Sequence, residues 1–206
     1  MPARLFVLAG VNGAGKSSLG GAALRAGGVE FFNPDSAAAR LRGQRPGLSA
    51  EQANGLAWTL GRRGLERALA EGLTYAFETT LGGASITRLL LDGARGGAEV
   101  NVWYAGLATP EMHLRRIRAR VAAGGHDIPE AKVRERFDAS RSNLVKLMPR
   151  LASLRVYDNS FEADPRAGQP PRPVLLLRMQ AGRVVAHAPL PEVPGWARPL
   201  LAAALR

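Results

Sequence analysis

A glycine-rich stretch near the N-terminus constrains this chain more than any other feature. Residues 10–18 read Gly-Val-Asn-Gly-Ala-Gly-Lys-Ser-Ser, which fits the phosphate-binding pattern G-x-x-x-x-G-K-[ST]. An apolar run at residues 5–9 precedes it as a strand would, and residues 17–19 follow where a helix should begin. Glycines in such a loop let successive backbone N–H groups point at one anion, and the helix N-terminus adds partial positive charge. This order predicts a strand, a phosphate-binding loop and a helix within an α/β fold.

The pattern also predicts which residues bind a nucleotide. Lys16 is placed to reach the β- and γ-phosphates, and the Ser17 hydroxyl to ligate Mg²⁺. The predicted nucleotide-binding residues are Gly10, Val11, Asn12, Gly13, Ala14, Gly15, Lys16, Ser17 and Ser18. The alternative, a glycine-rich turn with a chance lysine, is disfavoured by the strand before the loop and the helix after it.

The composition excludes several kinds of site. The chain has 206 residues, enough for one compact domain, and no cysteine, so it holds neither a disulfide nor a thiolate metal site. No apolar run approaches the ~20 residues that span a membrane. The apolar segment before the loop is too short for a signal peptide, so we expect a cytoplasmic protein.

The net charge of +11 raises the question of nucleic acid. Eight arginines and two lysines gather between Arg115 and Arg150, but few aromatic residues lie among them, so a base-stacking surface is not indicated. An anionic small ligand such as a nucleotide explains the cluster more simply. We therefore do not expect nucleic acid as a partner.

Strand and helix signals alternate along the chain, which predicts an α/β fold with a mainly parallel sheet. Strands are expected at residues 4–9, 29–32, 73–78, 99–105 and 154–158. Helices are expected at 17–25, from a capping box at Ser49 to residue 71, at 85–94, from residue 110 to the glycines at 124–125, and at 129–147. A proline-rich loop at 164–173 leads to a hairpin at 174–179 and 184–188 and a short helix at 196–205. We expect one domain over 1–206, with a core over about 1–160 and the hairpin and helix over about 172–206.

Two carboxylates follow strands whose ends should meet at one crevice. Asp35 lies just past the strand at 29–32, where it can take the proton of an attacking hydroxyl during phosphoryl transfer. Asp35 can also serve as a helix N-cap, or do both. Glu78 ends the next strand, and Thr80 adds a hydroxyl. These two side chains can hold a polyhydroxyl substrate or hydrated Mg²⁺. Alternatively, they are ordinary polar residues at the end of a strand.

The helix that starts at residue 110 carries two of the basic residues in a defined arrangement. Ile117 and Val121 mark its inward face. Arg116 and Arg120 lie four residues apart, so they share a ridge beside that face. Such a helix can close over a nucleotide and neutralise developing charge, or it can be a solvated basic surface.

The next helix carries Arg134 and Arg136, which are two residues apart and cannot share a face. At most one of them can aim at the same phosphate. Between the helices, Gly124-Gly125-His126 supplies a hinge, and His126 can cap, hinge or contact phosphate. His113 and His187 are isolated, and no spacing of histidines and carboxylates indicates a zinc site.

Taken in order, residues 10–18, Asn33-Pro34-Asp35 and Phe77-Glu78-Thr79-Thr80-Leu81 resemble the zeta-toxin family of P-loop kinases. Residues 116–121, 124–129, 136–137 and 157–160 continue the resemblance, which is to the small stand-alone bacterial branch and covers about residues 5–160. It implies a three-layer P-loop kinase fold with strand order 2-3-1-4-5. It also implies phosphorylation of the 3′-hydroxyl of UDP-N-acetylglucosamine, with ATP or GTP as donor and Mg²⁺.

The resemblance implies roles for individual residues as well. Asp35 would be the general base, beside Lys16 on the nucleotide and Ser17 on the metal. Glu78 and Thr80 would hold the sugar nucleotide. The γ-phosphoryl group would be stabilised by Arg120 and Arg136, with Arg134 as the substitute candidate for the second of these. An antitoxin-like protein is the partner that the resemblance suggests.

An alternative function is an ATPase or nucleotide switch that acts through a protein partner. Its ABC-type form is disfavoured because no Leu-Ser-Gly-Gly-Gln signature occurs, and because the strand at 73–78 ends in Glu78 where a Walker B strand ends in Asp. A kinase for another small molecule is the nearer alternative.

Overall fold

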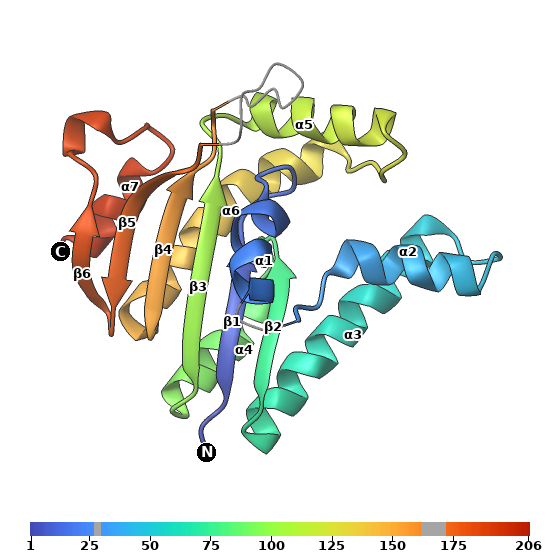
Figure 1. The fold of residues 1–206 in the computed structure, drawn as a ribbon, viewed down its shortest axis with the longest axis horizontal. Helices are drawn as coiled ribbons and strands as arrows, with labels where there is room; N and C mark the ends of the chain where they lie inside the picture. Colours follow the sequence, from blue (N-terminus) through green and yellow to red (C-terminus); the bar gives the residue numbers. More distant parts are fainter. Residues whose placement is uncertain (27–29, 162–171) are drawn as a thin grey trace.

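The computed structural model describes residues 1–26, 30–161 and 172–206. Its centre is a six-stranded sheet with the order β2-β1-β3-β4-β5-β6 (Figure 1). The strands are β1 Arg4–Ala9, β2 Thr74–Thr79, β3 Glu99–Gly106, β4 Ser153–Asp158, β5 Val174–Gln180 and β6 Arg183–His187. The first four pair in parallel, and β5 and β6 continue the sheet antiparallel.

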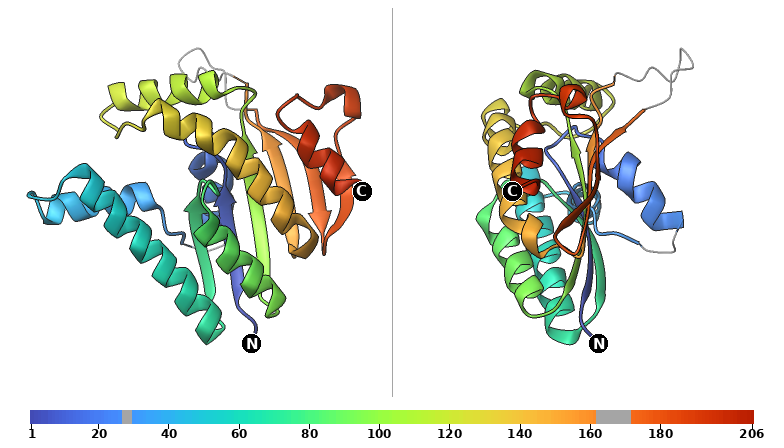
Figure 2. Two further views of the ribbon diagram at one scale, coloured as in Figure 1. Left: turned by 180° about the vertical axis from the view of Figure 1, so that it is seen from behind. Right: turned by 90° about the vertical axis from the view of Figure 1, so that its left-hand side faces the viewer.

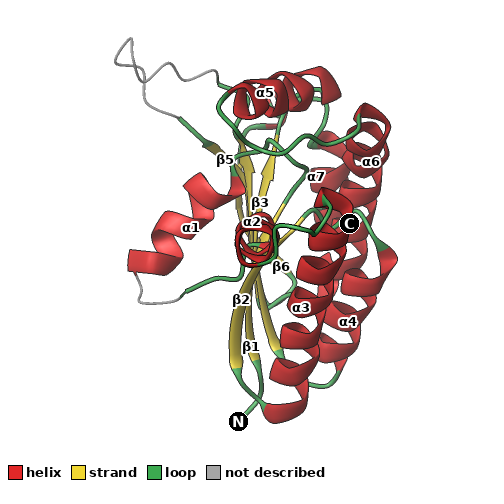
Figure 3. Ribbon diagram, turned by 90° about the vertical axis from the view of Figure 1, so that its right-hand side faces the viewer, coloured by secondary structure: helices red, strands yellow, loops and turns green. Residues whose placement is uncertain are grey.

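Helices cover both faces of this sheet. They are α1 Lys16–Ala26, α2 Pro34–Gln44, α3 Ala50–Glu71, α4 Ala84–Arg95, α5 Pro110–Ala122, α6 Glu130–Leu147 and α7 Arg198–Ala204, with short 3₁₀ turns η1 Met148–Arg150 and η3 Leu190–Glu192. Helix α1 lies on one face, and α3, α4, α6 and α7 lie on the other (Figures 2 and 3). The predicted three-layer α/β fold is therefore confirmed.

The core fills the space between the sheet and the α3–α4–α6–α7 layer. Alternating residues of the central strands are buried there, including Leu5 and Val7 of β1 and Val100 and Val102 of β3. This alternation follows from the period of two in a strand, because it turns one side-chain set toward the covering helices. None of the helices in the described residues has the length and apolar character needed to cross a membrane.

The predicted strand at 29–32 is reduced to a single bridge. Phe32 pairs in parallel with Phe77 of β2, donating from its N–H to the Ala76 carbonyl at 2.8 Å. This is the position that the predicted order gives to the second strand, but residues 30 and 31 form no strand and residue 29 lies outside the described residues. The chain leaves the sheet after Phe32 because Asn33 and Pro34 begin a helix.

That helix, α2, corrects one interpretation of Asp35. The N-cap is Asn33, whose Oδ1 accepts a hydrogen bond from the Ser36 N–H at 3.0 Å. Pro34 takes the first helical position, where a missing N–H costs nothing. Asp35 therefore does not cap the helix, and its carboxylate is left for other contacts.

Other boundaries agree with the sequence. The capping box is formed, with Ser49 Oγ accepting from the Gln52 N–H at 3.1 Å and Gln52 Oε1 from the Ser49 N–H at 2.9 Å. The β5–β6 hairpin turns at Ala181 and Gly182, both with positive φ. The glycines at 27–28 and residues 164–171 of the proline-rich loop lie outside the described residues.

Candidate active site

The phosphate-binding loop joins β1 to α1 at the carboxyl edge of the sheet. Gly10, Gly13 and Gly15 have φ of +133°, +82° and +83°, which favours glycine at each of these positions. A Cβ on Gly10 would also lie 2.1 Å from the Ala105 carbonyl oxygen of β3. Asn159, just after β4, donates from Nδ2 to the Ala14 carbonyl at 2.9 Å. The loop therefore lies close against the end of β3 and is hydrogen-bonded to the residue that follows β4.

Helix α5 is fastened to this loop through a buried histidine. His113 is 1% exposed, and its Nδ1 donates to the Asn12 carbonyl at 2.8 Å. Burial lowers the pKa of His113 to about 4, so the imidazole is neutral at pH 7. In the sequence His113 is isolated from other candidate residues, so this contact could not be predicted from spacing. Its place on the same face as Leu114 and Ile117 was the available signal.

The inward face of α5 differs from the expectation at one position. Ile117 is buried, but Val121 is 36% exposed, so the predicted burial of Val121 is wrong. The helix runs past the edge of the core in its last turn, where Figure 1 shows it extending beyond the sheet. Val121 therefore has little to pack against.

The two arginines of α6 have different surroundings. Arg136 Nη1 donates to Asn12 Oδ1 at 2.9 Å and the side chain lines a cavity beside the loop. Arg134 is exposed and forms ion pairs of 2.8 Å with both Glu111 and Glu130, which raise its pKa. The structure thus turns Arg136 toward the loop and leaves Arg134 joining α5 to α6.

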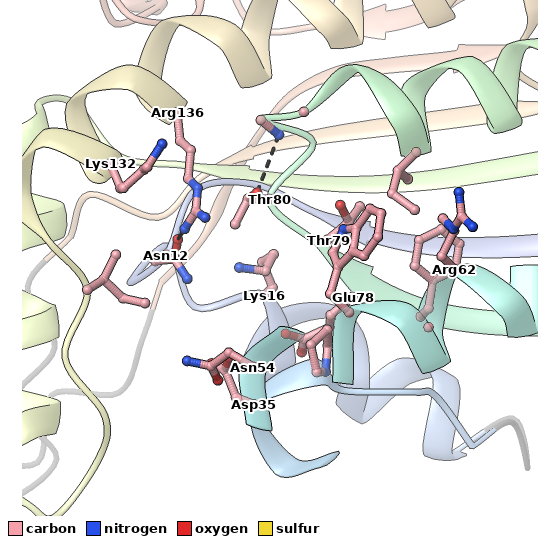
Figure 4. A pocket seen from close by; sticks show the side chains of 18 of the residues that line it. Asn12, Lys16, Asp35, Asn54, Arg62, Glu78, Thr79, Thr80, Lys132 and Arg136 are labelled. Atoms are coloured by element: carbon pink, nitrogen blue, oxygen red, sulfur yellow. Dashed lines mark hydrogen bonds between the residues drawn. The ribbon is translucent and has the colours of Figure 1, made fainter. Parts of the chain in front are cut away.

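Lys16 lies at the middle of the cavity (Figure 4). Burial lowers the pKa of Lys16, and the negative charges of Glu78 and Asp35 partly oppose that shift. The positive charges of Arg120 and Arg136 lower it further. The structure therefore brings together around Lys16 the two carboxylates and two arginines that the sequence selects.

Asp35 is contacted from the loop between α5 and α6 and from α5 itself. Arg120 Nη1 lies 3.4 Å from Asp35 Oδ2, and His126 Nε2 lies 3.5 Å from Asp35 Oδ1. Arg120 also donates from Nη2 to the His126 carbonyl at 3.0 Å. Arg116, on the same ridge, instead donates to the carbonyls of Asn159 and Phe161. The ridge is formed as predicted, but its two arginines diverge.

Glu78 and Thr80 lie at the end of β2. Glu78 is 8% exposed, and its buried Oε1 has no hydrogen-bond partner among the described residues. Thr80 Oγ1 accepts from the Gly82 N–H at 3.3 Å (Figure 4). An unpartnered buried carboxylate oxygen is costly, so this one fits a site whose ligand supplies the missing donor.

The cavity has a volume of about 390 Å³, within the range of small-molecule sites. Of the nine predicted loop residues, Asn12 and Lys16 line it, while Ser17 is half-buried and Ser18 exposed at the start of α1. The cavity is also lined by residues that no sequence motif predicted, among them Phe32, Asn54, Trp58, Arg62 and Lys132. Within 1–26, 30–161 and 172–206, no group of three or more His, Asp or Glu residues could hold a metal ion.

One family model and one curated relative match this chain in sequence. The AAA domain family, AAA_33, matches residues 5–147. A curated relative, an uncharacterized protein of Haemophilus influenzae, is 31% identical over 132 residues, which are 62% of this chain and 88% of that protein.

Two solved structures show the same fold. A chain of the AvrRxo1-ORF1:-ORF2 complex, solved with ATP, has a TM-score of 0.66 at 18% identity over 98% of this chain and 64% of its own. This chain thus spans a little under two thirds of that one. A chain of the PezAT toxin–antitoxin system of Streptococcus pneumoniae has a TM-score of 0.50 at 18% identity over 77% of this chain and 68% of its own. Because the family model matches residues 5–147, the chain belongs to the AAA domain family AAA_33, and its three-layer fold around one sheet is that of a P-loop kinase-like domain.

Proposed function

We propose that this protein is a kinase that transfers the γ-phosphoryl group of ATP or GTP to a hydroxyl of a small molecule. The observation that carries this proposal is that Asp35, Glu78 and Arg136 line one cavity around Lys16. Arg120 reaches this group through its pair with Asp35 at 3.4 Å. An acceptor hydroxyl in this cavity would have a carboxylate on one side and the phosphate-binding loop on the other. We also propose that residues 1–206 act as a single kinase domain.

The loop suits the phosphates of a nucleotide. Its left-handed glycines, the N-terminus of α1 and Lys16 all present positive charge or N–H groups to an anion. Lys16 would hold the β- and γ-phosphates, and Ser17 would hold Mg²⁺, whose charge offsets that of the phosphates when it is bound. The unpartnered Oε1 of Glu78 fits a water of that ion or a substrate hydroxyl.

In the transfer, Asp35 accepts the proton of the acceptor hydroxyl as the hydroxyl oxygen bonds to the γ-phosphorus. The bond from the γ-phosphorus to the β–γ bridging oxygen breaks, and its electron pair leaves with the nucleoside diphosphate. Arg120 and Arg136 balance the charge on the moving group. Because Arg120 pairs with Asp35 at 3.4 Å, it would exchange that carboxylate for the phosphoryl oxygens and release Asp35 as the base.

We further propose a UDP-amino sugar, such as UDP-N-acetylglucosamine, as the acceptor, and an antitoxin-like protein as a partner. The sequence resemblance to zeta toxins supports the acceptor, with Glu78 and Thr80 as its ligands. The relation of two similar folds to two-protein complexes, AvrRxo1-ORF1:-ORF2 and PezAT, supports the partner.

The test is a transfer screen. Purified protein with ATP and Mg²⁺ is incubated with UDP-sugars, nucleosides and aminoglycosides, and mass spectrometry detects any acceptor that gains a phosphoryl group. Lys16→Ala should abolish the product. Lys146→Ala, whose amine donates to Asn143 away from the cavity, is the matched control and should retain it.

A second candidate, an ATPase or switch that acts through a protein partner, gains support from the same two complexes. It predicts Lys16-dependent hydrolysis of ATP with no phosphorylated acceptor in the screen. That outcome would replace the kinase proposal.

A further inference from the structure

The end of the cavity remote from Arg136 is built by α3. Asn54, Trp58, Gly61 and Arg62 of this helix line the cavity, and their spacing of three to four residues puts them on one helix face. In Figure 4, Arg62 lies on the opposite side of Lys16 from Lys132 and Arg136. The cavity therefore extends well past the phosphate-binding loop, and none of these α3 residues belongs to the loop motif.

Arg62 has spare hydrogen-bonding capacity at this end. Its Nε is buried and has no hydrogen-bond partner in the described part of the chain. The neighbouring carboxylate, Glu66 Oε1, lies 3.6 Å from Nε in a half-exposed pair one helical turn away, which is a weak contact. A guanidinium that lines a cavity and has an unused N–H donor is suited to bind an anionic group of a ligand.

Trp58 supplies a ring surface beside that guanidinium. Trp58 is 47% exposed, and the Arg62 Cζ lies 5.5 Å from the centre of its ring. Behind it, Phe32 packs against α3 at Gly61, where a Cβ would come within 2.8 Å of the Phe32 ring. Large exposed aromatic rings in a cavity are typical of stacking sites.

We propose that Trp58 and Arg62 form a subsite for the part of the acceptor remote from its reacting hydroxyl. The acceptor class is a molecule with a planar ring, which stacks on Trp58, joined to a phosphate or carboxylate group, which pairs with Arg62. A nucleoside diphosphate moiety has this chemistry. The inference rests on the proposed function, since it assumes that the hydroxyl lies near Asp35, and it makes Trp58 and Arg62 specificity-determining residues.

The experiment is calorimetry with the phosphate-binding loop already filled by Mg²⁺ and a non-hydrolysable ATP analogue. The probes are UDP, which has ring and anion, uridine, which lacks the anion, and pyrophosphate, which lacks the ring. We expect UDP to bind at least about 10-fold more tightly than either fragment, because uridine lacks the charge pairing with Arg62 and pyrophosphate lacks the stacking on Trp58; a 10-fold difference corresponds to about 1.4 kcal/mol.

Variants separate the two contributions. Trp58→Ala should weaken UDP and uridine by about 10-fold and leave pyrophosphate unchanged. Arg62→Gln should weaken UDP and pyrophosphate by a similar factor and leave uridine unchanged. Arg63→Gln, an exposed neighbour that does not line the cavity, is the matched control. Unchanged affinity for the ATP analogue shows that each variant is folded.

The inference is overturned if Arg63→Gln and Arg62→Gln have equal effects, or if UDP binds only by displacing the ATP analogue. Its failure differs from that of the proposed function. If the protein phosphorylates a UDP-sugar and the acceptor KM is the same in Trp58→Ala and Arg62→Gln, the subsite is refuted and the kinase proposal stands. If the two variants weaken UDP binding but no phosphoryl transfer to any acceptor is found, the kinase proposal is refuted and the subsite stands.

Discussion

The carboxylate of Asp35 has the most demanding role in the proposed reaction. We predict that Asp35→Asn keeps nucleotide affinity but lowers phosphoryl transfer by about 10²-fold or more, the scale of lost general-base catalysis. Calorimetry and single-turnover transfer measure the two quantities. Because Asn33 and not Asp35 caps α2, Asn33→Ala is the control, and it should cost about 1 kcal/mol of stability while transfer continues. Full transfer by Asp35→Asn would refute the assignment.

His113 makes the stability of the protein depend on pH. Its pKa falls from the ordinary 6.5 to about 4 on folding because burial disfavours the charged ring. Between these values the unfolded chain binds a proton that the folded chain does not, so the free energy of unfolding rises with pH. The contribution is fully present above about pH 6.5 and is lost as the pH falls to about 4. The difference corresponds to about 3 kcal/mol.

We therefore predict that His113→Asn flattens the pH dependence of unfolding over this range. The Asn amide can replace Nδ1 as donor to the Asn12 carbonyl but does not titrate. Urea unfolding from pH 4 to pH 7 would measure the slope for both proteins. An unchanged slope would mean that His113 is not the group responsible.

Among the elements, α5 joins the phosphate-binding loop to α2, through His113 at one end and Arg120 at the other. We predict that Arg120→Ala lowers kcat strongly and changes nucleotide affinity less, because its charge is needed most as charge builds on the phosphoryl group. Steady-state kinetics and calorimetry check this split. Arg118 lies on the exposed face of the helix, so Arg118→Ala should lower kcat only slightly. Equal losses in both variants would mean that the cluster is structural.

Local patterns predicted most of the elements, while the site needed contacts between distant segments. The loop, the Ser49 capping box and the hairpin turn are each specified by a few adjacent residues, and all three are formed. A helix start is only one of two alternatives for Asp35 in the sequence, and the N-cap of α2 is Asn33 and not Asp35, because Pro34 takes the first helical position. Spacing along α6 shows only that Arg134 and Arg136 point in different directions. That Arg134 points away from the phosphate-binding loop depends on its ion pair with Glu111, which belongs to another helix. Trp58 and Arg62 carry no motif, and only the packing of α3 beside β2 places them in the cavity.

At the scale of the whole molecule, the C-terminal segment, residues 172–206 with β5, β6 and α7, completes the sheet. Strands β5 and β6 extend it beyond β4, and Trp196 packs over Gly106 at the end of β3, where a Cβ would come within 2.3 Å of the indole. Trp196 Nε1 donates to Asp158 Oδ1 at 3.1 Å, and its carbonyl accepts from Arg141 of α6 at 3.0 Å. The C-terminal segment therefore contacts β3, β4 and α6, the three elements that carry or support the site.

We predict from this that the hairpin and α7 unfold together with the nucleotide-binding core. Trp196 is 4% exposed, so Trp196→Ala should lower the free energy of unfolding by about 3–5 kcal/mol, the cost of removing a buried aromatic side chain. Leu190→Ala, at a side chain 57% exposed, should change it by less than about 0.5 kcal/mol. Urea unfolding followed by circular dichroism and by release of a bound ATP analogue should give one coincident transition in each protein. If Trp196→Ala instead gave an early transition that left the bound analogue in place, the C-terminal segment would be a separate folding unit, and the proposal of a single kinase domain over residues 1–206 would fail.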